Sequence, residues 1–212
     1  MSRFLVCDIA TAPIADAAQF HEPVSAPANY KDPEKIAAYV KEKEQEQTDR
    51  AGLDMDLCRI TGIGWQGIFR ASDKPVVRIA NDESGDCERD CLREFATLMD
   101  DHTIISFNGL KFDWPILMRR ALYLGVSFPT ISLDRFKSNH IDLYAKLTNS
   151  GTLSGHSLRF YAARLGWLDL EKTLTGAEEA QVFQSGKWAE LEASIRHDVT
   201  ATVRLAQWMN IL

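Results

Sequence analysis

Residues 103–118, TIISFNGLKFDWPILM, predict a buried strand, a tight turn and the start of a helix in immediate succession. The stretch 103–107 is apolar, as expected of a central strand that is covered on both faces. The Asn-Gly pair at 108–109 suits a tight turn with a positive φ angle, and Pro115 is well tolerated in the first turn of a helix. Asp113 therefore stands at the carboxyl end of a strand, where open α/β sheets place their chemistry. A plain helix cap is the alternative interpretation.

Two more aspartates stand at positions where a carboxylate is unusual. Asp8 closes the predicted strand 2–8, and Asp198 falls within an apolar stripe of the predicted C-terminal helix. The residues of that stripe repeat at spacings of four, three, four and three: Leu191, Ile195, Asp198, Thr202 and Leu205. A carboxylate on such a seam is costly unless it is paired or bound to a cation. A structural salt bridge and a metal ligand are therefore both open for Asp198.

Three carboxylates brought together from distant parts of the sequence suit a hard divalent cation. Mg²⁺ prefers oxygen ligands and is commonly held by one or two carboxylates together with substrate phosphate. Two such ions about 4 Å apart can act on the attacking water and the leaving oxygen of a phosphoryl displacement. Without metal, the same carboxylates would raise one another's pKa values. Asp8, Asp113 and Asp198 are therefore the predicted catalytic and metal-binding residues of a phosphodiester site that uses Mg²⁺ or Mn²⁺.

The order of the remaining elements predicts an α/β fold. Strands are expected at about 2–8, 58–69, 75–80 and 103–107 and near Ile131. Helices are expected around 92–99 and at about 114–124, 141–148, 155–165, 177–184 and 187–211. Early strands, one βα unit and a helix-rich tail indicate a mixed central β-sheet flanked by α-helices, within a single domain over residues 1–212.

A helix over residues 32–52 has clear ends. Asp32 suits the N-cap, Pro33 the first helical position and Gly52 the position just past the end. Its apolar residues stop halfway, and the stretch 41–47, KEKEQEQ, is polar on every side. We predict that this segment is a helical insertion or arm, which is either a solvated helix tip or a lid or partner-binding arm.

Composition narrows the class of protein. A chain of 212 residues with 45% hydrophobic and 25% charged residues is ordinary for one compact domain. The net charge of −6 argues against a protein that coats nucleic acid through bulk positive charge, but not against an enzyme that grips one strand end. No apolar run approaches the roughly 18 residues of a membrane span, and the first residues lack the apolar core of a signal peptide. We expect a cytoplasmic protein whose cysteines are reduced.

Three motifs carry a family resemblance. The stretch 108–113, NGLKFD, matches the pattern Asn-Gly-x-x-Phe-Asp throughout. The stretch 8–11, DIAT, matches Asp-x-Glu-Thr except at Ala10, and residues 198–199 match Tyr-x-x-x-Asp-Val except that Ser194 replaces the tyrosine. These motifs resemble those of the DEDD superfamily of 3′–5′ exonucleases, which share a ribonuclease H-like fold. The similarity is greatest to the branch related to the proofreading domain of family B DNA polymerases, and it runs from residue 3 to about residue 208.

The resemblance implies a 3′–5′ exonuclease that acts on single-stranded DNA ends by two-metal phosphodiester hydrolysis. In that role Asp8 would bridge two metal ions, Asp113 would support the second ion and Asp198 would hold the first. Ala10 and Ser194 are degenerate positions, because the family has a glutamate and a water-orienting tyrosine there. Weakened activity is one consequence. The alternative is a catalytically inactive ribonuclease H-like module that binds nucleic acid or a replication or repair protein.

The glutamate missing at position 10 leaves three explanations open. Position 10 is engineered, the enzyme is naturally degenerate, or another side chain replaces the glutamate. Asp16 and Asp142 are conceivable replacements. A missing ligand should cost at least the roughly 10- to 100-fold in metal affinity or activity that loss of an outer partner costs.

The predicted nucleic-acid contacts surround the first two motifs. They are Thr11, Asn108, Lys111, Phe112 and Trp114. Aromatic side chains can stack on bases without reading sequence, and a lysine can contact phosphate. The alternatives are core packing for the aromatic residues and an ordinary solvated charge for the lysine. The expected partner is single-stranded DNA, with RNA as the second choice.

Overall fold

The structure is a computed structural model that describes residues 3–68, 73–82, 84–99, 102–134, 139–167 and 174–212. Its strands are β1 (Phe4–Pro13), β2 (Cys58–Ile68), β3 (Val76–Ile79), β4 (Thr103–Ser106) and β5 (His140–Asp142). Its helices are α1 (Pro33–Ala51), α2 (Asp86–Thr97), α3 (Asp113–Leu124), α4 (Leu143–Leu147), α5 (Leu158–Arg164), α6 (Gly176–Gln184) and α7 (Trp188–Trp208). A 3-10 helix, η1 (Ala17–Phe20), follows β1.

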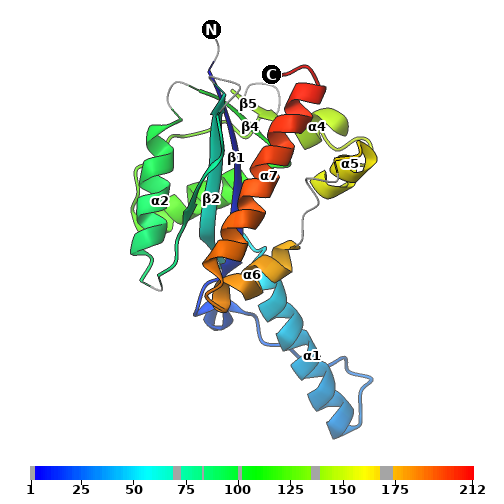
Figure 1. Cartoon of the computed structure of the whole chain (residues 1–212). Helices are drawn as coiled ribbons and strands as arrows, with labels where there is room; N and C mark the ends of the chain where they lie inside the picture. The colour runs from blue at the N-terminus through cyan, green and yellow to red at the C-terminus, as the bar shows by residue number, and fades with distance from the viewer. Residues whose placement is uncertain (1–2, 69–72, 83, 100–101, 135–138, 168–173) are drawn as a thin grey trace.

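The described strands form one mixed sheet in the order β3-β2-β1-β4-β5. β2 runs antiparallel to both β1 and β3, whereas β1, β4 and β5 run parallel to one another. Figure 1 shows α7 crossing one face of the sheet, with α2 on the other side. The predicted α/β class, with a mixed sheet flanked by helices, is confirmed.

Alternate side chains of β1 face two separate cores. Cys7 and Ile9 belong to the cluster that packs against α2 and α3, whereas Val6 and Ala10 belong to clusters formed with α6 and α7. This alternation follows from strand geometry, because successive side chains point to opposite faces of a sheet. Asp8 shares the parity of Val6 and Ala10, so the strand directs its carboxylate toward the α7 face.

Two glycines of β2 let α7 approach the sheet closely. A Cβ atom at Gly62 would lie 2.5 Å from Ile195 Cδ1, and one at Gly64 would lie 2.5 Å from Ile195 Cγ2. Carbon atoms pack at about 3.5–4.0 Å, so any larger residue at either position would push α7 outward. The glycines thus keep α7, and with it Asp198, against the strands that form the centre of the sheet.

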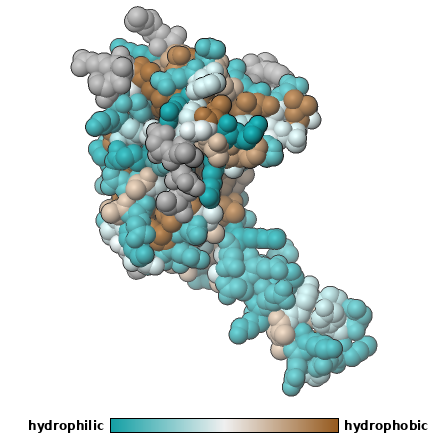
Figure 2. Space-filling view, turned by 45° about the vertical axis from the view of Figure 1, so that its right-hand side comes forward, coloured by the Kyte–Doolittle hydropathy of each residue, from teal (hydrophilic) through white to brown (hydrophobic). Residues whose placement is uncertain are grey.

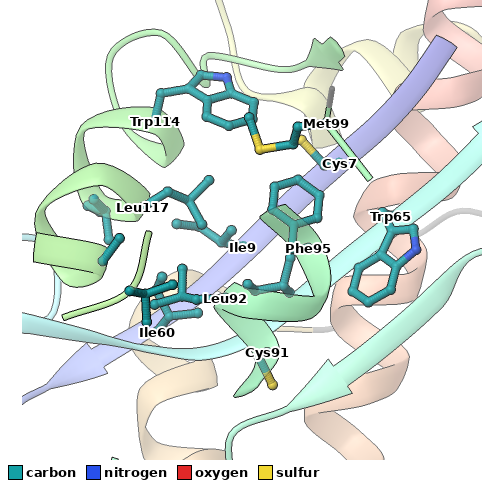
Figure 3. Packing of buried hydrophobic residues seen from close by; sticks show 14 of the residues in the cluster. Cys7, Ile9, Ile60, Trp65, Cys91, Leu92, Phe95, Met99, Trp114 and Leu117 are labelled. Atoms are coloured by element: carbon teal, nitrogen blue, oxygen red, sulfur yellow. The ribbon is translucent and has the colours of Figure 1, made fainter. Parts of the chain in front are cut away.

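The core on the α2 and α3 side is built around aromatic side chains. Phe95 packs against both Trp65 and Trp114, with ring centroids 5.8 and 6.2 Å away. Figure 3 shows these rings together with Met99 and Cys7 in the same packed layer. Trp114 is 0% exposed, so the prediction that it stacks on a nucleic-acid base is wrong and the core alternative is correct.

A buried ion pair ties both helices of this layer to the sheet. Nε and Nη2 of Arg120 in α3 donate to the two oxygens of Glu88 in α2 at 2.8 and 2.9 Å. The backbone N–H of Ile60 in β2 donates to the same carboxylate at 2.8 Å. One carboxylate therefore joins α2, α3 and β2.

The helix predicted over 32–52 has the bounds that its end signals indicate. The Asp32 carboxylate accepts a hydrogen bond from the Glu34 N–H at 3.0 Å, and Gly52 follows the last helical residue. Figure 1 shows α1 projecting from the body of the molecule, and Figure 2 shows that its surface is mostly hydrophilic. Across the described residues, no helix has both the length and the apolar character needed to cross a membrane.

Three expectations about the strands are wrong. Ile131 is buried, but it lies in irregular chain over 126–134 and forms no strand. The edge strand is instead β5, whose residues His140–Asp142 the sequence pattern largely assigns to a helix. β1 also continues to Pro13, past an irregularity in its pairing with β2 after Ala10, so Asp8 lies within the strand rather than at its end.

Candidate functional site

A cleft of about 740 Å³ opens beside β1 and α7. Asp8 and Asp198 both line it, and both are half-buried. Further lining residues come from the turn after β4, from α4 and from the chain at the start of α5; they include Phe107, Asn108, Lys111, Tyr144, His156 and Arg159. Two of the three predicted acids therefore share one cleft.

Asp113 lies behind the cleft rather than in its lining. It is the first residue of α3, and the N-cap is Phe112, so the helix-cap interpretation of the Asp113 side chain is wrong. The carboxylate is 3% exposed, and its Oδ2 has no hydrogen-bond partner among the described residues. Burial, followed by the nearby charges of Asp142 and Asp198, raises the pKa of Asp113 well above its ordinary value.

The thiol of Cys7 marks the point where two of the acids converge. Burial raises the pKa of Cys7, and the charges of Asp113 and Asp8 raise it further. The charge of Asp198 also acts on Asp113, so the three acids are linked by electrostatic interactions near this part of the strand. The fold thus gathers Asp8, Asp113 and Asp198 around one stretch of β1.

The turn that carries the second motif is anchored by Asp142. Its Oδ1 accepts hydrogen bonds from the N–H groups of Asn108 at 2.9 Å and Ala145 at 3.1 Å, and its Oδ2 accepts one from the Leu110 N–H at 3.1 Å. Asp142 is therefore a structural anchor rather than a replacement for the missing glutamate. Asp16 is exposed and lines a different cavity, beside η1, so it is not a replacement either.

A second set of hydrogen bonds, centred on His140 of β5, also holds this turn. The Nε2 of His140 lies 3.1 Å from the indole nitrogen of Trp114 and 2.8 Å from Ser106 Oγ, and that hydroxyl also accepts the Gly109 N–H at 3.1 Å. Burial lowers the pKa of His140 to about 3, so the ring is neutral, and Nε2 accepts from the indole because an indole nitrogen can only donate. A Cβ atom at Gly109 would lie 2.1 Å from Ser106 Oγ and 2.8 Å from Asp113 Oδ2, which leaves no room for a side chain.

The donors at this site fit a hard divalent cation. The three acids offer carboxylate oxygens, which are the ligands that Mg²⁺ and Mn²⁺ prefer. A buried acceptor without a partner costs about 1–3 kcal/mol, and a cation beside Asp113 Oδ2 would satisfy it. Within the described part of the chain, however, no group of three or more Asp, Glu, His or Cys side chains is already arranged to hold a metal ion. Binding by all three acids would therefore require them to draw closer together.

Both degenerate motif positions are buried and face α6. Ala10 packs in a cluster with Val182 of α6 and Ile195 of α7. Ser194 donates from its Oγ to Oε1 of Glu179 at 2.6 Å, and Glu179 is only 6% exposed. Nothing in the sequence pattern singles out Glu179, because it is one of two adjacent glutamates in a short helix.

The predicted nucleic-acid contacts divide into cleft residues and packed residues. Asn108 and the exposed Lys111 line the cleft. Phe112 is half-buried and packs against the core formed with α2 and α3. Thr11 is 7% exposed and donates its hydroxyl to the Gly52 carbonyl at 2.6 Å, so it anchors the end of α1 and its predicted contact with nucleic acid is wrong.

Tyr144, His156 and Arg159 line the cleft but were not among the predicted contacts. Phe107 packs edge-on against Tyr144, with ring centroids 5.5 Å apart. His156 stacks on Phe160 at a centroid distance of 3.9 Å, and the exposed Arg159 lies beside them. A single histidine or arginine has no sequence spacing that would mark it, so only the folded chain brings these side chains to the acids.

Comparison with known proteins identifies the fold family. The sequence matches the model of the RNase_H superfamily over residues 51–210. The family B DNA polymerase from the hyperthermophilic archaeon Pyrobaculum calidifontis has a similar structure, with a TM-score of 0.64 at 17% sequence identity. The match covers 99% of this chain and 25% of the polymerase chain, so this chain spans about a quarter of the polymerase's length. A comparison with curated proteins found no match. The expected ribonuclease H-like fold is confirmed, and the chain belongs to the RNase H superfamily.

Proposed function

We propose that this chain is a metal-dependent 3′–5′ exonuclease that removes nucleotides from single-stranded DNA ends. The observation that supports this most strongly is that Asp8 and Asp198 line one cleft, while the buried Asp113 lies close enough behind it to interact with Asp198. A nuclease-type fold with acids from separate elements around one cleft suits phosphodiester hydrolysis better than it suits a purely structural role.

The acids would supply the ligands for the reaction. Asp8, Asp113 and Asp198 would hold Mg²⁺ or Mn²⁺, which when bound neutralises phosphate charge and helps to ionise the attacking water. The water oxygen adds to phosphorus, the bond between phosphorus and the 3′ oxygen breaks, and that oxygen takes up a proton. A 5′-nucleotide leaves, and the strand keeps a new 3′-hydroxyl. Burial and neighbouring charges oppose the ionisation of Asp113, so a nearby cation would favour the ionised form of its carboxylate.

The rim of the cleft suits an unpaired strand. Lys111 and Arg159 are exposed there and can contact phosphates, which fix the position of a strand without reading its sequence. Phe107, Tyr144 and His156 offer aromatic surfaces on which unpaired bases can stack. A volume of about 740 Å³ lies within the range of small-ligand sites, so it accommodates a terminal nucleotide.

A nucleic-acid-binding module without catalysis is the second candidate. Ala10 and Ser194 place no ligand and no water-orienting phenol at the cleft, and the acids are not already arranged to hold a metal ion in the described part of the chain. The same basic and aromatic rim would still bind a strand.

Digestion of 5′-labelled single-stranded DNA in the presence of Mn²⁺ separates the two candidates. An exonuclease of this polarity produces a ladder of labelled products that shorten from the 3′ end. Asp8→Asn and Asp198→Asn should each lower the rate by about 10- to 100-fold or more, because loss of even an outer partner costs this much. Asp90→Asn, an exposed acid on α2, is the matched control and should leave the rate unchanged.

Absence of product from the parent chain with both Mn²⁺ and Mg²⁺ would refute catalysis. Fluorescence anisotropy with the same DNA then tests the second candidate. Binding by the parent that Lys111→Ala and Arg159→Ala each weaken would support a binding module at this cleft.

A further inference from the structure

A cavity of about 770 Å³ lies at the end of the sheet where β1 ends and β2 begins. Its walls come from residues 12–16, from Arg59 of β2, from the chain before α2, from the end of α3 and from the turn between α6 and α7. It has no described lining residue in common with the cleft that holds Asp8 and Asp198. Figure 1 shows this end of the sheet, near α1 and α6, away from the two chain termini. The cavity is therefore separate from the cleft.

Arg59 lines this cavity with most of its hydrogen-bonding capacity unused. A guanidinium group carries five N–H donors. Within the described part of the chain, its one hydrogen bond runs from Nη2 to the Ala80 carbonyl at 3.4 Å, and its Nε is buried without an acceptor. Carboxylate oxygens of Asp82 and Glu88 lie 3.7 and 3.9 Å from guanidinium nitrogens, which is ion-pair distance but too far for a hydrogen bond. Arg59 therefore brings to the cavity donors that no described residue accepts.

The two acids nearest to Arg59 are held in place by other donors. Both oxygens of Glu88 accept hydrogen bonds from Arg120, at 2.8 and 2.9 Å. Oδ2 of Asp82 accepts two backbone N–H groups in the first turn of α2, at 3.0 and 3.1 Å. These bonds fix both carboxylates at their distances from Arg59. A ligand is therefore the better source of an acceptor for the Arg59 guanidinium.

Aromatic and apolar side chains form the walls around Arg59. Its guanidinium carbon lies 5.4 Å from the centre of the Phe183 ring, and Trp188 packs edge-on against Phe183 at a centroid distance of 5.3 Å. Leu124 of α3 and Ile14 after β1 line the same cavity. A ring face attracts the guanidinium charge, but it offers no acceptor in the plane of the N–H groups. These walls suit an apolar side chain, and Arg59 suits a carbonyl beside it.

The more exposed charges of the cavity are acidic. Asp16 is exposed and the Asp82 side chain is 25% exposed, whereas the side chains of Arg59 and Arg120 are only 12% and 10% exposed. A nucleic-acid strand would bring its phosphates close to these carboxylates, and juxtaposed like charges oppose binding. Lysine or arginine side chains of a peptide would be attracted instead. Charge complementarity therefore favours a basic peptide over nucleic acid.

We propose that this cavity is a docking site for a short segment of a partner protein. The segment places an apolar side chain against Phe183 and Trp188, and its backbone carbonyl accepts a hydrogen bond from Arg59. Neighbouring lysine or arginine side chains of the segment lie near Asp16 and Asp82. A peptide supplies all three groups, whereas a free nucleotide lacks the positive charge. The inference does not rest on the proposed function, because the cavity and the cleft are separate.

Selection of random dodecapeptides displayed on phage, with the full chain as the target, tests this proposal. Enriched peptides should carry an apolar or aromatic residue next to lysine or arginine, and fluorescence anisotropy then measures the affinity of each synthetic peptide. Arg59→Met should weaken binding by about 10-fold or more, because it removes a charged donor. Asp16→Lys should weaken binding by about two- to fivefold, as expected for an exposed charge. Arg78→Met is the matched control and should leave the affinity unchanged, because Arg78 also lies over an aromatic ring, that of Trp65, but outside the cavity.

Three outcomes would overturn the proposal. The first is that no enriched peptide binds the parent chain, and the second is that the peptides bind Arg59→Met and Asp16→Lys as tightly as the parent. The third is that labelled dodecathymidine binds the parent and Arg59→Met weakens that binding, which would assign the cavity to nucleic acid. Thermal unfolding reports whether each variant is folded. If Arg59→Met does not fold, Asp16→Lys decides, because unchanged peptide affinity in that variant refutes docking at this cavity.

Discussion

Asp113 and Asp142 are buried neighbours that should respond in opposite ways to the same substitution. The carboxylate of Asp142 accepts three backbone N–H groups, whereas Oδ2 of Asp113 has no hydrogen-bond partner among the described residues. In Asp142→Asn the side-chain N–H₂ group would face the Leu110 N–H, so two donors would meet. We expect this to lower the free energy of unfolding by about 1–3 kcal/mol.

Asp113→Asn should instead stabilise the metal-free chain. The substitution removes a carboxylate whose ionised form is opposed by burial and by the charges of Asp142 and Asp198. Asparagine carries no charge, so it removes the cost of ionising a buried carboxyl beside other acids, which we take as about 1–3 kcal/mol. A chain of this length gains about 2–4 °C in Tm per kcal/mol. We therefore expect the Tm of Asp113→Asn in chelator to rise by about 2–12 °C.

Thermal unfolding with and without Mn²⁺ measures both effects. At about 100 times its dissociation constant, Mn²⁺ should stabilise the parent by about 2.7 kcal/mol, and Asp113→Asn should lose most of that gain. Asp142→Asn is the control for disruption of a buried acid. A lower Tm in chelator for Asp113→Asn, comparable to that of Asp142→Asn, would refute the view that Asp113 is held at a cost for function.

Acid should abolish the advantage of Asp113→Asn. The folded-state pKa of Asp113 lies above its ordinary value of 3.8, so the folded chain binds this proton more readily than the unfolded chain does. The penalty is therefore absent below about pH 4, where both states are protonated, and grows as the pH rises toward the folded-state pKa. The Tm difference between Asp113→Asn and the parent should shrink as the pH is lowered.

Two further predictions concern buried groups outside the cleft lining. The pKa of His140 falls from 6.5 to about 3 on folding, so the stability that its neutral ring supports is complete above pH 6.5 and falls by about 2 kcal/mol at pH 5. His140→Gln keeps an acceptor for Trp114 and should make the free energy of unfolding, measured by urea titration, less dependent on pH. An unchanged pH dependence would contradict this prediction. Glu88→Gln breaks a buried ion pair with Arg120 and should lower the free energy of unfolding, measured in urea, by about 3–5 kcal/mol. Glu94→Gln breaks an exposed ion pair with Arg78 and should lower it by at most about 1 kcal/mol. Equal losses would show that burial does not decide the cost.

Local chemistry made part of the fold predictable. The ends of α1 follow from Asp32, Pro33 and Gly52, because a cap, a helix-starting proline and a terminating glycine act within a few residues. The strand, turn and helix of the second motif follow from residues 103–118 for the same reason. In both cases the determinants lie in the segment itself.

The remaining features depend on partners that are distant in sequence. β5 is only three residues long, and it is a strand because β4 offers it a free edge. Asp142 becomes an anchor only after that pairing brings it to the turn at 108–110. Trp114 resembles a stacking residue next to a motif until α2 covers it with Phe95. Glu179 accepts a hydrogen bond from Ser194, which belongs to another helix.

The segment that contains α1 connects β1 to β2, and its two ends lie side by side at one end of this strand pair. Pro13 pairs with Cys58, and the Ile14 N–H donates to the Leu57 carbonyl at 2.9 Å, so residues 14–57 leave and re-enter as a hairpin loop would. The entropy of closing a loop rises only slowly with its length. The pairing register of β1 and β2 therefore depends little on the length of the segment that connects them. A short turn or a foreign module grafted here would leave the acids of β1, α3 and α7 where they are.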